Sequence, residues 1–306
     1  MIDPLLVLTS AALEAAVGYP AQLHKRVPHP VVWIGSLIGA AERVFNRTEW
    51  PGRRRKVAGV CTVIGVVLIV GAAGTAIARL GAIAVVIAAT VGLAQRSLHD
   101  HAAAVAVGLR TDDLPAARLA VGLIVGRDTA DLDQGGITAA ALESLAESFN
   151  DGVIAPLFWL LVAGLPGLFI YKAMNTADSM IGHMEPRWRD FGWAAARTDD
   201  ILNYIPARIA GGLVVLATGG GWSVMLRDAP KHASPNAGWP EAAMAGALQV
   251  TLGGPARYDG ALHVRPTFGD GPAPRPEDLT RGLAIYRRAC FAAWIFLLAG
   301  GVLWHL

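Results

Sequence analysis

The sequence predicts an all-α, polytopic integral membrane protein, and three observations lead to this fold class. Of the 306 residues, 54% are hydrophobic and only 16% are charged, with a mean hydropathy of +0.44. Soluble domains carry about a quarter charged residues. Several uncharged runs are long enough to cross roughly 30 Å of hydrocarbon as helices. The third observation is that the polar motifs concentrate within residues 126–260. We expect one membrane domain over residues 1–306, with about five to six membrane segments, kinked or re-entrant helices, and amphipathic interfacial helices.

Charge and cysteine content exclude several other classes. The formal net charge is +2, and no basic run is interleaved with aromatic residues as a strand-binding groove requires, so we expect no nucleic acid partner. The two cysteines, Cys61 and Cys290, each lie in an apolar run, which indicates neither a disulfide framework nor a cysteine-rich metal site. The N-terminus lacks a basic region and is expected to be a retained membrane segment.

The first third of the chain predicts short and long apolar helices in alternation. Residues 4–17 form a short apolar helix, a polar connection with turns follows from Gly18 to Pro30, and residues 31–43 form an amphipathic helix whose Trp33 suits an interface. Two membrane spans at 57–77 and 80–93 are then separated by a tight turn.

The basic cluster at residues 53–56 directly precedes the first of these spans. Such clusters lie on the cytoplasmic side of a membrane. We therefore interpret it as a topology signal and not as a substrate patch. His99 and His101 are two residues apart and fall on different helical faces, so a surface or interface pair is favoured over a metal site.

Three stripes of polar residues follow, each with the spacing of one helical face. Glu143, Glu147 and Asn150 form the first stripe, within a helix expected over 137–151. Tyr171, Asn175 and Asp178 form the second, and the third comprises Arg197, Asp200, Tyr204 and Arg208. We expect a shared, water-accessible cleft. The alternative is that these residues are packed ion pairs and caps between helices.

The apolar segments beside these stripes create a topology problem. If 153–170 and 209–226 both spanned the membrane, the polar stripes would be divided between two faces. We therefore predict that at least one segment is kinked or re-entrant, or that the stripes line a cavity within the membrane. Pro156, Gly164 and Pro166 interrupt the first segment and glycines 219–221 the second. Pro206 is expected to end or kink the third polar helix.

The C-terminal third is expected to begin as a polar region. Residues 227–286 contain a predicted helix at 240–252 and a proline-rich stretch at 266–278 that we expect to be an extended surface loop. A final membrane helix is predicted at 289–306, after two arginines.

The motifs, taken together, resemble the cobalamin-biosynthesis CobD/CbiB family over essentially the whole chain. The segments that carry the resemblance are Gly126–Thr129, Glu143–Gly152, Ala155–Phe158, Tyr171–Met180, Asp199–Arg208, Lys231–Glu241 and Leu252–Gly260. Two departures exist. The family often has Gly-Asp-Pro where this chain has Gly18-Tyr19-Pro20, and Glu-Asn where it has Glu147-Ser148.

This resemblance implies an adenosylcobinamide-phosphate synthase in the bacterial inner (cytoplasmic) membrane, a multi-pass ligase that forms a C–N bond. Such an enzyme joins the free propionate carboxyl of adenosylcobyric acid, a corrinoid, to the amine of aminopropanol or of its phosphate ester. The reaction consumes ATP and needs Mg²⁺. The expected partners are these substrates, membrane lipid and other enzymes of the cobalamin pathway.

The chemistry of amide ligation suggests roles for the residues within these motifs. No P-loop motif occurs, so ATP needs another kind of site. Carboxylates suit metal or amine recognition, and arginines suit phosphates and corrin carboxylates. The expected catalytic residues are Glu143, Glu147, Asp151, Asp178 and His232, of which Glu143, Glu147 and Asp178 are also expected to bind metal. The expected substrate- and phosphate-binding residues are Arg127, Asp128, Lys172, Asn175, Ser179, Arg197, Asp200, Asn203, Arg208, Lys231, Ser234, Asn236, Arg257 and Tyr258.

Two other functions are compatible with a polar, membrane-embedded chain. One is a transporter of a corrinoid or another anionic metabolite, since polar residues inside membrane segments are typical of transport pathways. Against it, the sequence shows no two matching halves of the inverted-repeat kind. The other is a non-catalytic scaffold for corrinoid enzymes. The sequence leaves open whether the amine is phosphorylated before ligation and which oligomer forms.

Overall fold

The computed structural model describes residues 1–19 and 28–306, which form two compact units built from segments that alternate along the sequence. The first unit comprises Met1–Ala94, Ala155–Asn203 and Leu297–Leu306, and the second comprises Gln95–Ile154 and Tyr204–Phe296. The expectation of a single domain stays a prediction. The turns expected around Pro20 lie outside the described residues.

The predicted fold class is confirmed, since the chain is 72% helical. Among the described residues, five helical stretches are long and apolar enough to cross a membrane: Gly52–Ala78, Ala82–Arg110, Gln134–Ile181, Trp193–Thr218 and Pro276–Trp304. A shorter apolar helix lies at Pro4–Val17. The chain is a multi-pass, all-α membrane protein.

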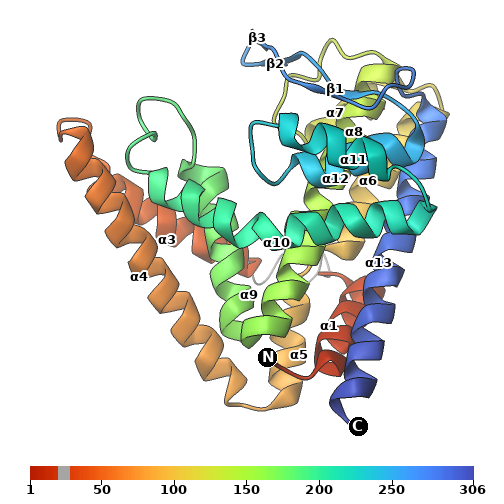
Figure 1. The fold of residues 1–306 in the computed structure, drawn as a ribbon. Coiled ribbons are helices and arrows are strands. Elements are labelled where there is room, and N and C mark those ends of the chain that lie inside the picture. Colours follow the sequence, from red (N-terminus) through yellow and green to blue (C-terminus); the bar gives the residue numbers. More distant parts are fainter. Residues whose placement is uncertain (20–27) are drawn as a thin grey trace. The chain divides into compact units, whose positions relative to one another are not determined.

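The first unit contains α1 (Pro4–Val17), α3 (Pro30–Phe45), α4 (Gly52–Ala78), α5 (Ala82–Val91), α9 (Ala155–Ile181) and the start of α10 (Trp193–Thr218) (Figure 1). Helix α1 begins at Pro4 because the Asp3 carboxylate accepts the Leu5 N–H at 2.9 Å and because proline suits a first helical position. Its bounds match those expected from the sequence.

Helix α9 contains the predicted break. Gly164 has φ 66° and ψ −160°, a conformation open essentially to glycine alone, and Pro166 follows it. The chain reverses there, so that α9 has two limbs joined by a turn (Figure 1). A Cβ atom on Gly167 would lie 2.6 Å from the Trp159 carbonyl oxygen, so the limbs touch beside the turn. The segment 153–170 therefore does not cross as one straight helix.

Helix α10 continues through Pro206, so of the two expected outcomes the helix end is wrong and the kink stays a prediction. The helix runs from Trp193 to Thr218, because the carbonyl that proline leaves without its helical donor finds another one. The indole Nε1 of Trp159 donates to the Leu202 oxygen at 3.0 Å. The glycines at 219–221 end the helix instead, with Gly219 and Gly221 both at positive φ.

The second unit contains α6 (Gln95–Arg110), α7 (Leu114–Gly122), α8 (Gln134–Phe149), α11 (Trp222–Asp228), α12 (Gly238–Leu248) and most of α13 (Pro276–Trp304). A π-helical turn, η1 (Asn150–Ile154), follows α8, and a 3-10 turn, η2 (Ala229–Lys231), precedes α12. Helix α13 begins 13 residues before the predicted position 289, since the polar residues after Pro276 form its first turns.

Four short strands in the second unit were not predicted. β1 (Leu252–Gly253) pairs antiparallel with β4 (Thr267–Phe268), and β2 (Ala256–Tyr258) pairs antiparallel with β3 (Ala261–His263). The stretch 266–278, predicted to be an extended loop, therefore contains β4 near its start, and its pairing with β1 orders that part. This pairing brings residue 253 and the segment around residue 265 to the end of α8.

Candidate functional site

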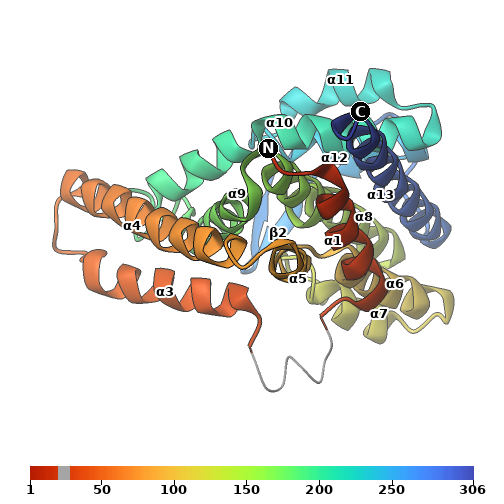
Figure 2. The same cartoon turned by 90° about the horizontal axis from the view of Figure 1, so that it is seen from below.

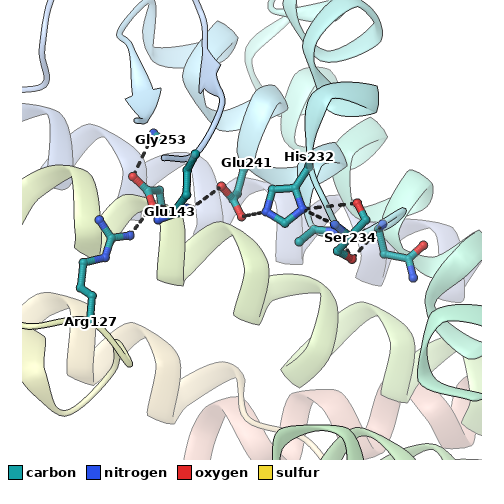
Figure 3. A network of polar contacts seen from close by, with 9 residues as sticks. Arg127, Glu143, His232, Ser234, Glu241 and Gly253 are labelled. Carbon is teal, nitrogen blue, oxygen red and sulfur yellow. Dashed lines mark hydrogen bonds and ion pairs between the residues drawn. The ribbon is translucent and has the colours of Figure 1, made fainter. Parts of the chain in front are cut away.

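A network of charged residues in the second unit is centred on Glu143, which lies on α8 and is 3% exposed. Its Oε2 atom pairs with the guanidinium of Arg127 and with Nη2 of Arg265 at 3.1 Å. Its Oε1 atom accepts the Gly253 N–H at 2.9 Å (Figure 3). One carboxylate thus holds the loop before α8, strand β1 and the segment before β4 together.

Arg265 also faces Glu241, a residue of α12 that is 1% exposed, at 3.8 Å between Nη2 and Oε2. Two atoms of this pair lack hydrogen bonds within the described part of the chain: Glu241 Oε2 and Arg265 Nη1 are both buried and unsatisfied. An unsatisfied buried polar atom costs about 1–3 kcal/mol. Such atoms in a native protein call for an explanation, and a ligand supplies one.

These atoms lie at a cavity of about 120 Å³. Its lining residues are Ile124, Val125, Gly126, Arg127, Ala140, Glu143, Ser144, Glu147, Glu241, Tyr258 and Arg265. The lining carries three carboxylates and two guanidinium groups, and the Glu147 side chain is exposed to it. Pockets for whole ligands measure about 300–1,000 Å³. The cavity therefore has room for one small polar group of a substrate, such as an ammonium or a phosphate.

His232 lies next to Glu241, with Nε2 3.7 Å from Oε1 (Figure 3). Its Nδ1 atom accepts the Ser234 N–H at 2.9 Å, and this bond assigns the proton of the neutral ring to Nε2. The ring stacks on Phe268 with the centroids 6.0 Å apart. Burial, together with the charge of Arg265, lowers the pKa of the His232 imidazole, so the ring is neutral at physiological pH.

The pKa of the Glu241 carboxyl is shifted in the opposite direction to that of His232. Burial raises the pKa of its carboxyl well above the usual glutamate value, and the negative charges of Glu147 and Glu143 raise it further. A carboxyl with a raised pKa beside a neutral imidazole is a typical pair for proton transfer. The arrangement can bind a cationic group, accept its proton, and hold an anionic group beside it.

The neighbouring predicted residues have structural partners. The Lys231 ammonium pairs at 2.6 Å with Asp228, which is 1% exposed and also binds Arg227 and the Gly269 N–H. The hydrogen bonds from Arg227, then those from Lys231 and Gly269, hold the pKa of Asp228 well below its ordinary value. This buried carboxylate anchors the turn that carries His232.

Ser234 and Asn236 order the start of α12. The hydroxyl oxygen of Ser234 accepts the Asn236 N–H at 3.2 Å and the Ala237 N–H at 3.4 Å. This pattern is a serine turn, which supplies acceptors for N–H groups near a helix start. Ser234 therefore shapes the loop that presents His232.

Asp128, Arg257 and Tyr258 belong to the hairpin side of the cavity. Asp128 accepts the Gly260 N–H at 2.8 Å and donates its own N–H to the Arg257 oxygen at 2.9 Å, which fixes the β2–β3 hairpin to the loop of Arg127. The guanidinium of Arg257 is exposed, whereas Tyr258 lines the cavity. Arg208, by contrast, stacks over the Tyr204 and Trp239 rings at 3.6 and 4.6 Å.

The remaining predicted residues divide between the two units. Asp151 accepts a hydrogen bond of 2.7 Å from Asn150 in the π-helical turn after α8, a local irregularity that is frequent at functional sites. Those in the first unit are Lys172, Asn175, Asp178, Ser179, Arg197, Asp200 and Asn203. There Asn203 accepts from the buried Tyr171 hydroxyl at 3.0 Å. The shared cleft of all three stripes stays a prediction.

The metal role expected for Glu143 stays a prediction, and in this structure both of its oxygens accept from guanidinium or N–H donors. Within residues 1–19 and 28–306, no group of three or more His, Cys, Asp or Glu side chains is arranged to hold a metal ion. Asp178, the third expected ligand, belongs to the first unit. The contacts that the structure does show for Glu143 hold two arginines in place.

Sequence reasoning missed two residues of this site, Glu241 and Arg265. Glu241 ends the motif that begins at Lys231, so its place in that motif was a usable signal. Arg265 lies outside all the motifs, and only strand pairing brings it to Glu143, 122 positions away.

Comparisons with known proteins agree on one family. The family model described as CobD/Cbib protein matches residues 7–286. The chain is 48% identical over 311 residues to "Cobalamin biosynthesis protein CobD" of Rhodobacter capsulatus, covering 98% of each chain. It is 48% identical to the Brucella suis protein of the same name over 271 residues, with 83% of each covered, and 44% identical to that of a Sinorhizobium species over 321 residues, with 98% and 99% covered.

No solved structure matches this chain. The family match extends from α1 into α13 and includes every residue that lines the charged cavity. The sequence identity to the named relatives is far above the level at which family membership is in question. The charged cavity lies within the matched residues, and the chain belongs to the CobD/Cbib family.

Proposed function

We propose that this chain is a cobalamin-biosynthesis enzyme of the bacterial inner membrane, an adenosylcobinamide-phosphate synthase. It would join aminopropanol, or its phosphate, to the propionate carboxyl of adenosylcobyric acid in an amide ligation that consumes MgATP. The names of the relatives support the pathway. The single observation that carries the reaction class is the cavity at which unsatisfied Glu241 and Arg265 atoms meet.

Amide formation needs a neutral amine, whereas an alkyl amine is an ammonium ion at pH 7. The carboxylates at the cavity, Glu147 and Glu241, suit recognition of this ammonium by charge. In this proposal Glu241 accepts its proton while ionised, and His232 holds the Glu241 carboxyl through Nε2. The bond that breaks is N–H on the amine, and the proton is transferred to a Glu241 oxygen. The amine lone pair then becomes available for the carboxyl carbon.

The partner of the amine is a carboxyl activated by ATP, as an acyl phosphate with release of ADP. When the amine nitrogen forms the C–N bond, the carbon–oxygen bond to the phosphate breaks and phosphate leaves with the electron pair, while the second amine proton is lost to a base or to water. Negative charge that develops on oxygen during such a step is stabilised by guanidinium groups fixed in advance. Arg127 and Arg265 are fixed by Glu143, and Nη1 of Arg265 remains available at the cavity. These arginines would bind the carboxyl or phosphate oxygens next to the amine.

The test uses the full chain, purified in detergent or nanodiscs. It is given adenosylcobyric acid, MgATP and either aminopropanol or aminopropanol phosphate, and the amide product is measured by mass spectrometry. We expect ATP-dependent product with at least one amine. Folded protein that forms no product with either amine would overturn the enzyme proposal. The two amine arms also decide which form is the substrate.

Matched variants locate the reaction within the second unit. Arg265→Gln and Glu241→Gln should each lower the rate of product formation by at least 100-fold. Removal of one preorganised electrostatic group lowers the rate of other enzymes by a similar factor. Arg281→Gln and Glu277→Gln are the controls, since both lie on exposed parts of α13 away from the cavity lining. Equal activity in all four variants would show that the cavity is structural.

A further inference from the structure

An apolar groove of about 510 Å³ lies between α3 and α4 in the first unit. Leu37, Ala41 and Phe45 line it from α3, and Cys61, Gly65 and Ile69 line it from α4. Both rows repeat every fourth residue, so the groove follows the helix axes, and the two helices lie side by side in both views (Figure 2). Because α4 is long and apolar enough to span a membrane, the groove runs along a helix that we expect to lie in the hydrocarbon.

One end of the groove is cationic. Arg54 lines it, with its guanidinium 3.8 Å from the Trp50 ring, and Arg53 beside it is exposed. Residues 42–56 contain six Lys and Arg residues but two Glu residues, so this end is strongly positive. Tryptophan and basic residues at the end of a membrane helix mark the headgroup level.

The other basic residues of the cluster at 53–56 have structural partners. Arg55 is 7% exposed and donates to Asn46 at 2.9 Å and to the Pro186 oxygen at 3.2 Å. The Lys56 ammonium lies 3.7 Å from the Trp193 ring. Among the residues that the structure describes, neither Arg53 nor Arg54 pairs with a carboxylate. Their charges are therefore available to an anionic partner at the mouth of the groove.

The length and lining of the groove suit a lipid chain. From Arg54 to Ile69 the groove extends about 22 Å along α4, at 1.5 Å per residue. Over that length it is lined mostly by apolar side chains, and its charged residue, Arg54, lies at one end. An extended acyl chain matches this shape, with its charged headgroup at the Arg54 end. The length exceeds one leaflet of about 15 Å of hydrocarbon, enough for a full chain.

We propose that this groove binds one acyl chain of an anionic phospholipid, whose phosphate lies against Arg53 and Arg54. Basic clusters beside a membrane helix attract anionic headgroups at about 1 kcal/mol per residue. The apolar groove adds a defined binding position for the acyl chain, so the lipid is held at one place and not only attracted by charge. The bound lipid covers a surface of α3 and α4 that is otherwise open between them.

The test uses photoreactive phosphatidylglycerol with a diazirine on its acyl chain, and phosphatidylcholine with identical chains, on the full-length protein in nanodiscs. Crosslinks are mapped by peptide mass spectrometry. We expect residues 37–69 to be labelled at least fivefold more by phosphatidylglycerol. Arg53→Gln/Arg54→Gln should remove this preference, since the exposed arginines act through charge and not through packing.

A second variant tests the groove itself. A Cβ atom on Gly65 meets no atom within 4 Å, so Gly65→Leu fills the groove without displacing the backbone. It should reduce labelling of residues 37–69 at least fivefold. Gly212→Leu is the matched control, because Gly212 also has open space around it and lies on α10. Equal labelling by both lipids, or unchanged labelling in Gly65→Leu, would overturn the proposal.

Discussion

Replacement of Glu143 by glutamine isolates the central contact of the charged network. The amide oxygen of glutamine can still accept the Gly253 N–H, but its NH₂ group would face the donors of Arg127 and Arg265. Two charge-assisted hydrogen bonds are then lost, each of about 1.5–3 kcal/mol. Both arginines are largely buried, and loss of one partner from a buried ion pair costs about 3–5 kcal/mol.

We therefore expect Glu143→Gln to lower the free energy of unfolding by about 3–5 kcal/mol. For a chain of this size the melting temperature would fall by roughly 10 °C. The assay is thermal unfolding of the purified protein in detergent, followed by near-ultraviolet circular dichroism. Glu277→Gln is the control, because this exposed residue at the start of α13 should contribute about 0.5 kcal/mol or less.

A double-mutant cycle with Arg265→Gln separates the contact from general damage. If Glu143 acts by holding Arg265, the two substitutions together should destabilise less than the sum of the single ones, by about 1–3 kcal/mol. Strict additivity would refute the direct coupling. A melting temperature of Glu143→Gln within about 3 °C of wild type would refute the role of Glu143 as the anchor of both arginines.

Three further predictions follow from single residues. The raised pKa of Glu241 keeps its carboxyl protonated to a higher pH than usual, so activity should rise as pH increases through that value, and the rise should be absent from the pH–rate profile of Glu241→Gln. Asp228→Asn should lose about 2–3 kcal/mol of stability at pH 7. Because the folded pKa of Asp228 is lowered, this contribution is present above about pH 4 and disappears as pH falls through the folded value, so wild type and variant should converge in acid denaturation. Gly164→Ala should cost about 1–3 kcal/mol, measured by thermal unfolding, because its φ of 66° with ψ −160° is strained for alanine. Gly212→Ala, at a helical position with open space, should be neutral or slightly stabilising, and an equal loss in both variants would contradict the strain argument.

The sequence alone determined the features that depend on neighbours along the chain. Hydropathy identified the fold class and the run that became α4, and capping chemistry set the bounds of α1. The break at Gly164 was also predictable, since a glycine and two prolines in an apolar run leave few other conformations. Motif resemblance gave the family and most of the residues of the charged network.

The tertiary structure decided the features that depend on distant segments. Pro206 could stay inside a helix because Trp159 supplies the donor for the free carbonyl, which no local pattern encodes. The short strands form because β1 and β4 meet, and this meeting brings Arg265 to Glu143. From residue type alone Glu143 was a carboxylate suited to metal, and that role stays a prediction. The fold places two guanidinium groups against it, and the contact with Arg265 spans more than a hundred residues, which spacing along the chain cannot encode.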